Sequence, residues 1–201
     1  MLGNRVGVVV GDVTGHGIGP ALLMAETRAY LRILARNRED VGEILTRANR
    51  VLAEDIGYER FITMLLVSLD PQKRTFTYAN AGHPAGYVLD GSGEIKARLK
   101  RTGLPLGIKP DMAYPQAPAT SLSPGDVLLL LTDGIEEAMS PDDNIFGTER
   151  ILEIVRSNRE KSARDIVDAL YAAVRQFAQN CDGGGDESRL SFAGAVSQAS
   201  P

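Results

Sequence analysis

Two aspartates each follow a run of aliphatic residues and stand beside a glycine. Asp12 comes after VVVG at 8–11, and Asp133 comes after LLLLT at 128–132 and precedes a glycine. Aliphatic runs that stop at a glycine predict buried strands, so both carboxylates are expected at strand ends. Carboxylates gathered at one sheet rim repel one another unless a cation lies between them, and oxygen-only ligands favour magnesium or manganese. The two aspartates are therefore candidate metal ligands.

A centre with two such metals can orient a bridging water and clamp a phosphoryl group for in-line attack. The alternative is that Asp12 and Asp133 are ordinary turn residues, because aspartate beside glycine is common in turns. Spacing alone leaves both interpretations open.

The chain has two histidines, and each stands in a glycine-containing segment. His16 lies four residues beyond Asp12 and could either donate a proton to a leaving group or hydrogen-bond the loop together. We favour the loop role, because attack by a metal-bound hydroxide needs no histidine. His83, in AGHP at 81–84, is expected to pack in a turn or at the surface.

The first aspartate lies between a strand and a pair of helices. A strand is predicted over 5–10, followed by a glycine-rich loop over 11–19 and a helix over 21–35. A second helix is expected to start at Asp40, which has Glu43 three residues later and is followed by an apolar stripe. Both helices should pack on one sheet face.

The rest of the chain predicts strands joined by tight turns, followed by two more helices. Thr148 and Ser162 are the expected N-caps of those helices. This order indicates an α+β sandwich of antiparallel sheets flanked by helix pairs. The expected strands are 61–69, 75–80, 86–89, 94–99 and 127–131.

Composition excludes several classes of protein. With 201 residues and 43% hydrophobic residues, the chain should form one globular domain, which we place at 1–190, with a tail at 191–201. A net charge of -4 argues against a nucleic-acid partner, and no apolar run is long enough to span a membrane. One cysteine allows no internal disulfide. A cytoplasmic location is expected, because no signal peptide follows Met1.

Five sequence blocks follow one another in a recognisable order. The blocks are GDVTGHG at 11–17 with GPALLMA at 19–25, FITM at 61–64 with TYANAGHP at 77–84, GLPLG at 103–107, GDVLLLLTDG at 125–134, and FGTER at 146–150. In this order they resemble the PPM-family (type 2C-like) metal-dependent serine/threonine phosphatases of the SpoIIE and RsbU type. The resemblance implies an αββα sandwich that lacks its first strand here, with a two-metal centre of manganese or magnesium.

The same resemblance implies roles for individual residues. Asp12 matches the carboxylate that bridges both metals, the carbonyl of Val13 matches a neighbouring ligand, and Asp133 matches a ligand of the first metal. Asp186 is the best match to an acidic ligand near the C-terminus.

An acidic motif that family members carry on an earlier strand has no counterpart in this sequence. We therefore expect an incomplete second metal site and weak or absent turnover. We also expect an unpaired edge beside the first strand that favours a homodimer.

By this resemblance the chain hydrolyses phosphoserine or phosphothreonine on a regulatory protein, an anti-sigma-factor antagonist being the expected substrate. One alternative is a catalytically impaired pseudophosphatase that acts as a dimerising or signal-receiving module. A second alternative is a metallohydrolase that acts on small phosphoesters.

Overall fold

The computed structural model describes residues 5–36, 40–56, 60–179 and 194–198. The chain divides into two units, each of which is built from two separate stretches of the sequence. The first unit contains residues 1–85 and 99–122, and the second contains residues 86–98 and 123–201. Whether residues 1–190 act as one domain stays a prediction.

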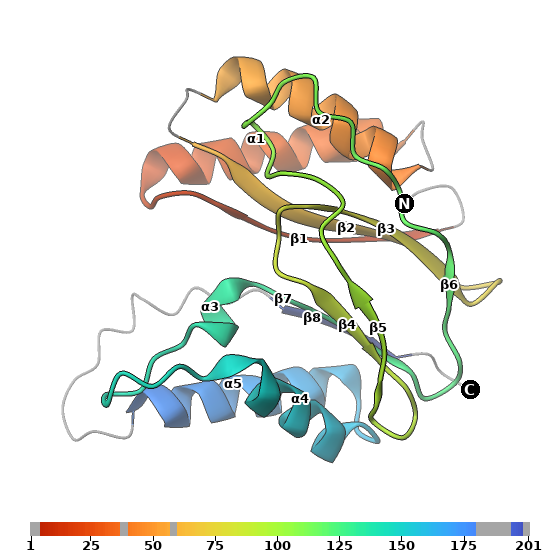
Figure 1. Ribbon diagram of the computed structural model, residues 1–201, viewed down its shortest axis with the longest axis vertical. Helices are drawn as coiled ribbons and strands as arrows, with labels where there is room; N and C mark the ends of the chain where they lie inside the picture. The colour runs from red at the N-terminus through yellow and green to blue at the C-terminus, as the bar shows by residue number, and fades with distance from the viewer. Residues whose placement is uncertain (1–4, 37–39, 57–59, 180–193, 199–201) are drawn as a thin grey trace. The chain divides into compact units, whose positions relative to one another are not determined.

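The first unit is a sheet with a helix pair on one face (Figure 1). Its strands are antiparallel and lie in the order β1-β2-β3-β6. The two helices bury their apolar stripes against the sheet, and this interface forms the core of the unit. The elements are β1 (Val6–Val13), α1 (Ile18–Leu34), α2 (Val41–Asp55), β2 (Ile62–Asp70), β3 (Thr75–Ala81) and β6 (Thr120–Ser121).

The start of α2 agrees with the prediction. Asp40 is the N-cap, and its carboxylate accepts a hydrogen bond of 2.9 Å from the backbone N–H of Glu43. Such a cap satisfies one of the backbone donors that a helix leaves unpaired at its start. The predicted apolar stripe of α2 is fully buried, at Val41, Ile44, Leu45, Ala48 and Leu52.

The second unit repeats this plan with a different set of elements. Its strands lie in the order β5-β4-β7-β8, and α4 and α5 pack their apolar stripes against β7 and its neighbours. The antiparallel sheets with their helix pairs confirm the expected α+β class. The elements are β4 (Gly86–Leu89), β5 (Ile95–Leu99), β7 (Val127–Leu131), α3 (Asp133–Glu136), α4 (Gly147–Asn158), α5 (Ala163–Gln179) and β8 (Gly194–Gln198).

Three local predictions were wrong. The first strand does not end at Val10 but continues through Asp12 to Val13, because β2 pairs with it over the whole length. The segment 191–201, expected to be a tail, contains β8, which pairs antiparallel with β7 and so satisfies backbone groups of that buried strand. Thr148 lies inside α4 rather than at its cap, and its hydroxyl donates to Glu136 instead.

The second C-terminal helix begins as predicted. Ser162 and Asp165 form reciprocal hydrogen bonds at the start of α5. The helix buries the apolar side chains of Ile166, Leu170 and Val174. In the described ranges, no helix has both the length and the apolar character that crossing a membrane requires.

Candidate functional site

Asp12 lies near the end of β1, where the strand leads into the loop before α1. Its neighbour across the ladder is Thr63 of β2, and its side chain is exposed. Residues directly opposite in an antiparallel pair project to the same face, with Cβ atoms about 4.5–5.5 Å apart. The carboxylate of Asp12 therefore shares its sheet face with the hydroxyl of Thr63.

The backbone at Val13 is oriented so that its carbonyl is available to a ligand. The partner of Val13 in the register is Ile62, but Ile62 exchanges both of its backbone hydrogen bonds with Leu106, at 3.0 and 2.8 Å. Hydrogen-bonded and non-hydrogen-bonded pairs alternate along an antiparallel ladder, so the carbonyl of Val13 points away from β2. Among the described strands, β1 ends its sheet, so this carbonyl faces the open edge.

The loop after Val13 is held to β2 by one residue. Thr14 donates its backbone N–H to the carbonyl of Phe61 at 3.1 Å, and the hydroxyl of Thr14 accepts from the N–H of Phe61 at 3.0 Å. A threonine side chain thus replaces the backbone bond that would have continued the strand. This clamp fixes the chain direction directly beyond Asp12 and Val13.

Gly11 allows β1 and β2 to approach closely just before Asp12. A Cβ atom at Gly11 would lie 2.9 Å from the carbonyl oxygen of Thr63. Any larger residue would push the two strands apart at this point. The glycine itself is the sequence signal for this feature, although it lies inside β1 and not at the start of the predicted loop.

Asp133 is the first residue of α3 and follows β7 through Thr132. It is partly exposed, and its backbone carbonyl accepts from Glu137 at 2.7 Å. The hydroxyl of Thr132 is buried and has no hydrogen-bond partner in the described part of the chain. A polar group of this kind beside a carboxylate is consistent with a site that binds a polar ligand.

The predicted ligands lie in both units. Asp12 and Val13 belong to the first unit and Asp133 to the second, whereas Asp186 lies outside the described residues. Within those residues, no three His, Cys, Asp or Glu side chains form a group that could hold a metal ion. The donors that are described are carboxylate and carbonyl oxygens, which fit a hard cation such as Mg2+ or Mn2+.

The two histidines lie in different surroundings. His16 is exposed and has no hydrogen-bond partner among the described residues, and its expected loop-holding role stays a prediction. His83 is fully buried, and its Nδ1 lies 2.8 Å from the hydroxyl oxygen of Thr63. Sequence reasoning assigned His83 to turn packing and missed its contact with the strand opposite Asp12.

Sequence reasoning also missed a buried amide that holds the long connection before β6. Asn49 of α2 is fully buried and donates to the carbonyls of Lys109 and Pro110, while its own oxygen accepts from the N–H of Gly107. Tyr114 packs beside it, and burial raises the pKa of its phenol to about 12. The polar side chain within an apolar helix stripe was the only signal.

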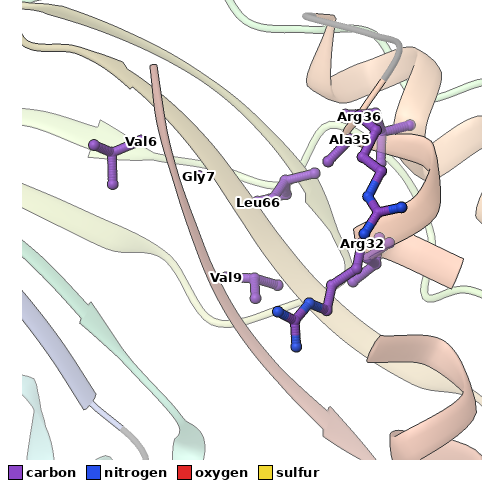
Figure 2. Close-up of a pocket in the computed structure, with 9 residues that line it drawn as sticks. Val6, Gly7, Val9, Arg32, Ala35, Arg36 and Leu66 are labelled. Atoms are coloured by element: carbon purple, nitrogen blue, oxygen red, sulfur yellow. The ribbon is translucent and has the colours of Figure 1, made fainter. Parts of the chain in front are cut away.

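A pocket of about 350 Å³ lies between β1 and the C-terminal half of α1. Figure 2 shows Val6, Gly7 and Val9 along the strand, and Arg32 and Arg36 on the helix beyond them. Neither Asp12 nor Val13 lines it. The pocket is therefore separate from the candidate metal ligands of this unit.

Comparison with known proteins gives the family. The family model described as Stage II sporulation protein E (SpoIIE) matches residues 3–188. The phosphoserine phosphatase RsbU of Bacillus subtilis is 28% identical over 171 residues, which are 85% of this chain and 50% of the relative. The chain thus spans about half the length of that curated relative.

Two solved structures have the same fold. The SiaA-PP2C domain of Pseudomonas aeruginosa matches with a TM-score of 0.79 and 21% identity, covering 97% of this chain and 75% of that one. The RsbU and RsbW domains of a Mycobacterium tuberculosis protein match with a TM-score of 0.74 and 26% identity, covering 98% and 54%. The matches to the family model, to RsbU and to these folds agree with the sequence motifs: the chain belongs to the SpoIIE family of PPM-type phosphatases.

Proposed function

We propose that this chain is the catalytic domain of a metal-dependent protein serine/threonine phosphatase. The observation that carries the proposal is the end of β1, where the exposed carboxylate of Asp12 is followed by a carbonyl of Val13 that points to the open edge of the sheet. Two oxygen donors on consecutive residues suit a hard cation. Membership of the SpoIIE family supports the reaction class.

In this proposal the carboxylate of Asp12 and the carbonyl oxygen of Val13 would help to hold a centre of two Mn2+ or Mg2+ ions. Asp133 would be a ligand of the first ion, and Asp186 would be a further ligand near the C-terminus. Bound ions of this kind lower the pKa of a coordinated water and neutralise charge on phosphoryl oxygens. The chain's own part is to hold these oxygens in place, which the Thr14 clamp and the β1–β2 ladder do for Asp12.

The proposed substrate is a phosphoserine or phosphothreonine of a regulatory protein. The similarity to RsbU, a phosphoserine phosphatase, supports the phosphorylated residue. We extend the proposal to an anti-sigma-factor antagonist as the natural target and to a homodimer as the assembly. Location in the cytoplasm follows from such a target.

The test compares three aspartate-to-asparagine variants on a phosphoserine peptide with Mn2+. Asp12→Asn and Asp133→Asn should each lower turnover by at least about 100-fold, because several kcal/mol of transition-state stabilisation depend on the ions. Asp142→Asn is the matched control, since Asp142 is exposed in a turn, and should keep full activity. Calorimetric titration with Mn2+ should show the same order of effects on binding.

Two outcomes would contradict the proposal. If Asp12→Asn hydrolyses the peptide as fast as the unchanged chain, Asp12 is no metal ligand. If the unchanged chain binds Mn2+ but releases no phosphate from any phosphopeptide, a pseudophosphatase that receives signals or dimerises would be favoured instead.

A further inference from the structure

His83 is a histidine buried in the tight turn that follows β3. It follows β3 through Gly82, whose φ of 71° lies in the left-handed region that favours glycine. A Cβ at Gly82 would lie 2.5 Å from the ring of Pro105, so the turn is packed tightly against the connection that follows β5. His83 itself is fully buried, which for an imidazole demands polar partners.

The backbone of His83 is held by a side-chain network. The N–H of His83 donates to Oδ1 of Asn80 at 2.8 Å, and Nδ2 of Asn80 donates to the carbonyl of Leu99 at 3.1 Å. The N–H of Asn80 also donates to the hydroxyl of Thr102 at 3.0 Å. Because Asn80 is fully buried, these bonds are shielded from water and hold the backbone at His83 in place.

The imidazole in turn contacts the strand that lies beside the candidate metal ligand. Its Nδ1 and the hydroxyl oxygen of Thr63 are 2.8 Å apart. Thr63 lies directly opposite Asp12 in the β1–β2 ladder, on the same face of the sheet. A continuous path of contacts therefore runs from the Asn80 network through His83 and Thr63 to the strand end that carries Asp12.

We propose that His83 is a positioning residue for the metal centre, acting through Thr63 on the carboxylate of Asp12. The hydrogen bond fixes the rotamer of Thr63, and the fixed side chain limits the orientations open to the Asp12 carboxylate beside it. Groups that orient a metal ligand from behind typically contribute 10- to 100-fold in metal affinity. This inference rests on the proposed function, in which Asp12 binds the metal.

Thr63→Val tests the contact with little change of shape, because valine keeps the branched side chain and lacks the hydroxyl. We expect its affinity for Mn2+, measured by calorimetry without substrate, to fall by about 10-fold or more. Thr63→Ser keeps the hydroxyl and should stay within about threefold of the unchanged chain. His83→Asn, which retains a polar atom near the position of Nδ1, should lie between the two.

Thr77→Val is the matched control. Thr77 is a buried threonine of β3 in the same sheet, and its hydroxyl has no hydrogen-bond partner among the described residues. Its replacement should leave Mn2+ affinity unchanged. Urea unfolding is measured for every variant, and Mn2+ affinities are compared only between variants that are folded.

A double variant distinguishes a connected path from two separate effects. If His83 acts through Thr63, the double variant Thr63→Val/His83→Leu should bind Mn2+ about as weakly as the weaker-binding of the two single variants. If the fold-loss in the double variant equals the product of the two single fold-losses, the proposed path is overturned. If Thr63→Val does not fold, the Mn2+ affinities of His83→Leu and His83→Asn are compared instead. His83→Leu should bind Mn2+ more weakly than His83→Asn, and equal affinities would overturn the proposal.

Asp12→Asn separates this inference from the proposed function. If Asp12→Asn keeps its Mn2+ affinity, the proposed function itself fails. If Asp12→Asn loses affinity while Thr63→Val binds Mn2+ like the unchanged chain, only the positioning role of His83 is refuted.

Discussion

Replacing Gly42 by alanine should destabilise the protein, although the same change in an isolated helix would stabilise it. Alanine is favoured over glycine in a helix interior by about 1 kcal/mol. In the structure, however, a Cβ at Gly42 would lie 2.2 Å from the carbonyl oxygen of Tyr114 and 2.7 Å from the backbone nitrogen of Gln116. These are backbone atoms, so no side-chain rotation relieves the contact.

The magnitude follows from what must move. Restoring normal van der Waals separation requires α2 and the segment at Tyr114 to move apart by roughly 1 Å. That shift stretches two hydrogen bonds, from the N–H of Tyr114 to the hydroxyl of Thr46 at 2.9 Å and from the N–H of Val41 to the side chain of Gln116 at 3.0 Å. Overpacking costs about 1–3 kcal/mol and each of the two bonds about 1 kcal/mol, so the net loss of stability should be about 2–4 kcal/mol after the helix gain of about 1 kcal/mol is subtracted.

Gly19→Ala provides a matched control, because Gly19 and Gly42 are each the second residue of their helix. A Cβ at Gly19 would first meet the end of the Arg60 side chain at 3.2 Å, and that side chain is exposed and can rotate away. Its stability should be unchanged or higher by up to about 1 kcal/mol. Urea unfolding followed by circular dichroism measures both variants. If Gly42→Ala is as stable as Gly19→Ala, the packing argument is refuted.

Three further changes have defined outcomes. Gly11→Ala should push β1 from β2 and weaken Mn2+ binding measured by calorimetry, whereas Gly91→Ala, whose Cβ would meet nothing within 4 Å, should not. Asn49→Ala should lower the free energy of unfolding by about 2–5 kcal/mol, because two carbonyls and one N–H lose their buried partner. Hydrogen bonds from Ser162 lower the pKa of Asp165, so their stabilisation is present above the ordinary value of 3.8 and is lost as pH falls below it. Ser162→Ala should raise that pKa toward its ordinary value in an NMR titration, and an unchanged pKa would contradict this assignment.

Local rules predicted the parts of the fold that depend on neighbouring residues. The capping pairs at Asp40 and Ser162 were identified correctly, because each is a hydrogen bond between residues three apart. The hairpins were also found, since turn residues and alternating patterns lie next to one another in the chain. The same rules failed at Thr148, which was expected to cap α4. Its hydroxyl instead donates a hydrogen bond to the carboxylate of Glu136, twelve residues earlier in the chain.

The α+β class, the family motifs and the two strand-end aspartates could be predicted from the sequence, because each depends only on residue types and short spacings. Features that depend on contacts between distant residues were decided by the tertiary structure. It extended β1 to Val13 by pairing with β2, and it directed the carbonyl of that residue to the sheet edge. It also buried His83 against Thr63, twenty residues away. These features depend on which distant backbone supplies each hydrogen-bond partner, and only the folded chain brings those partners together.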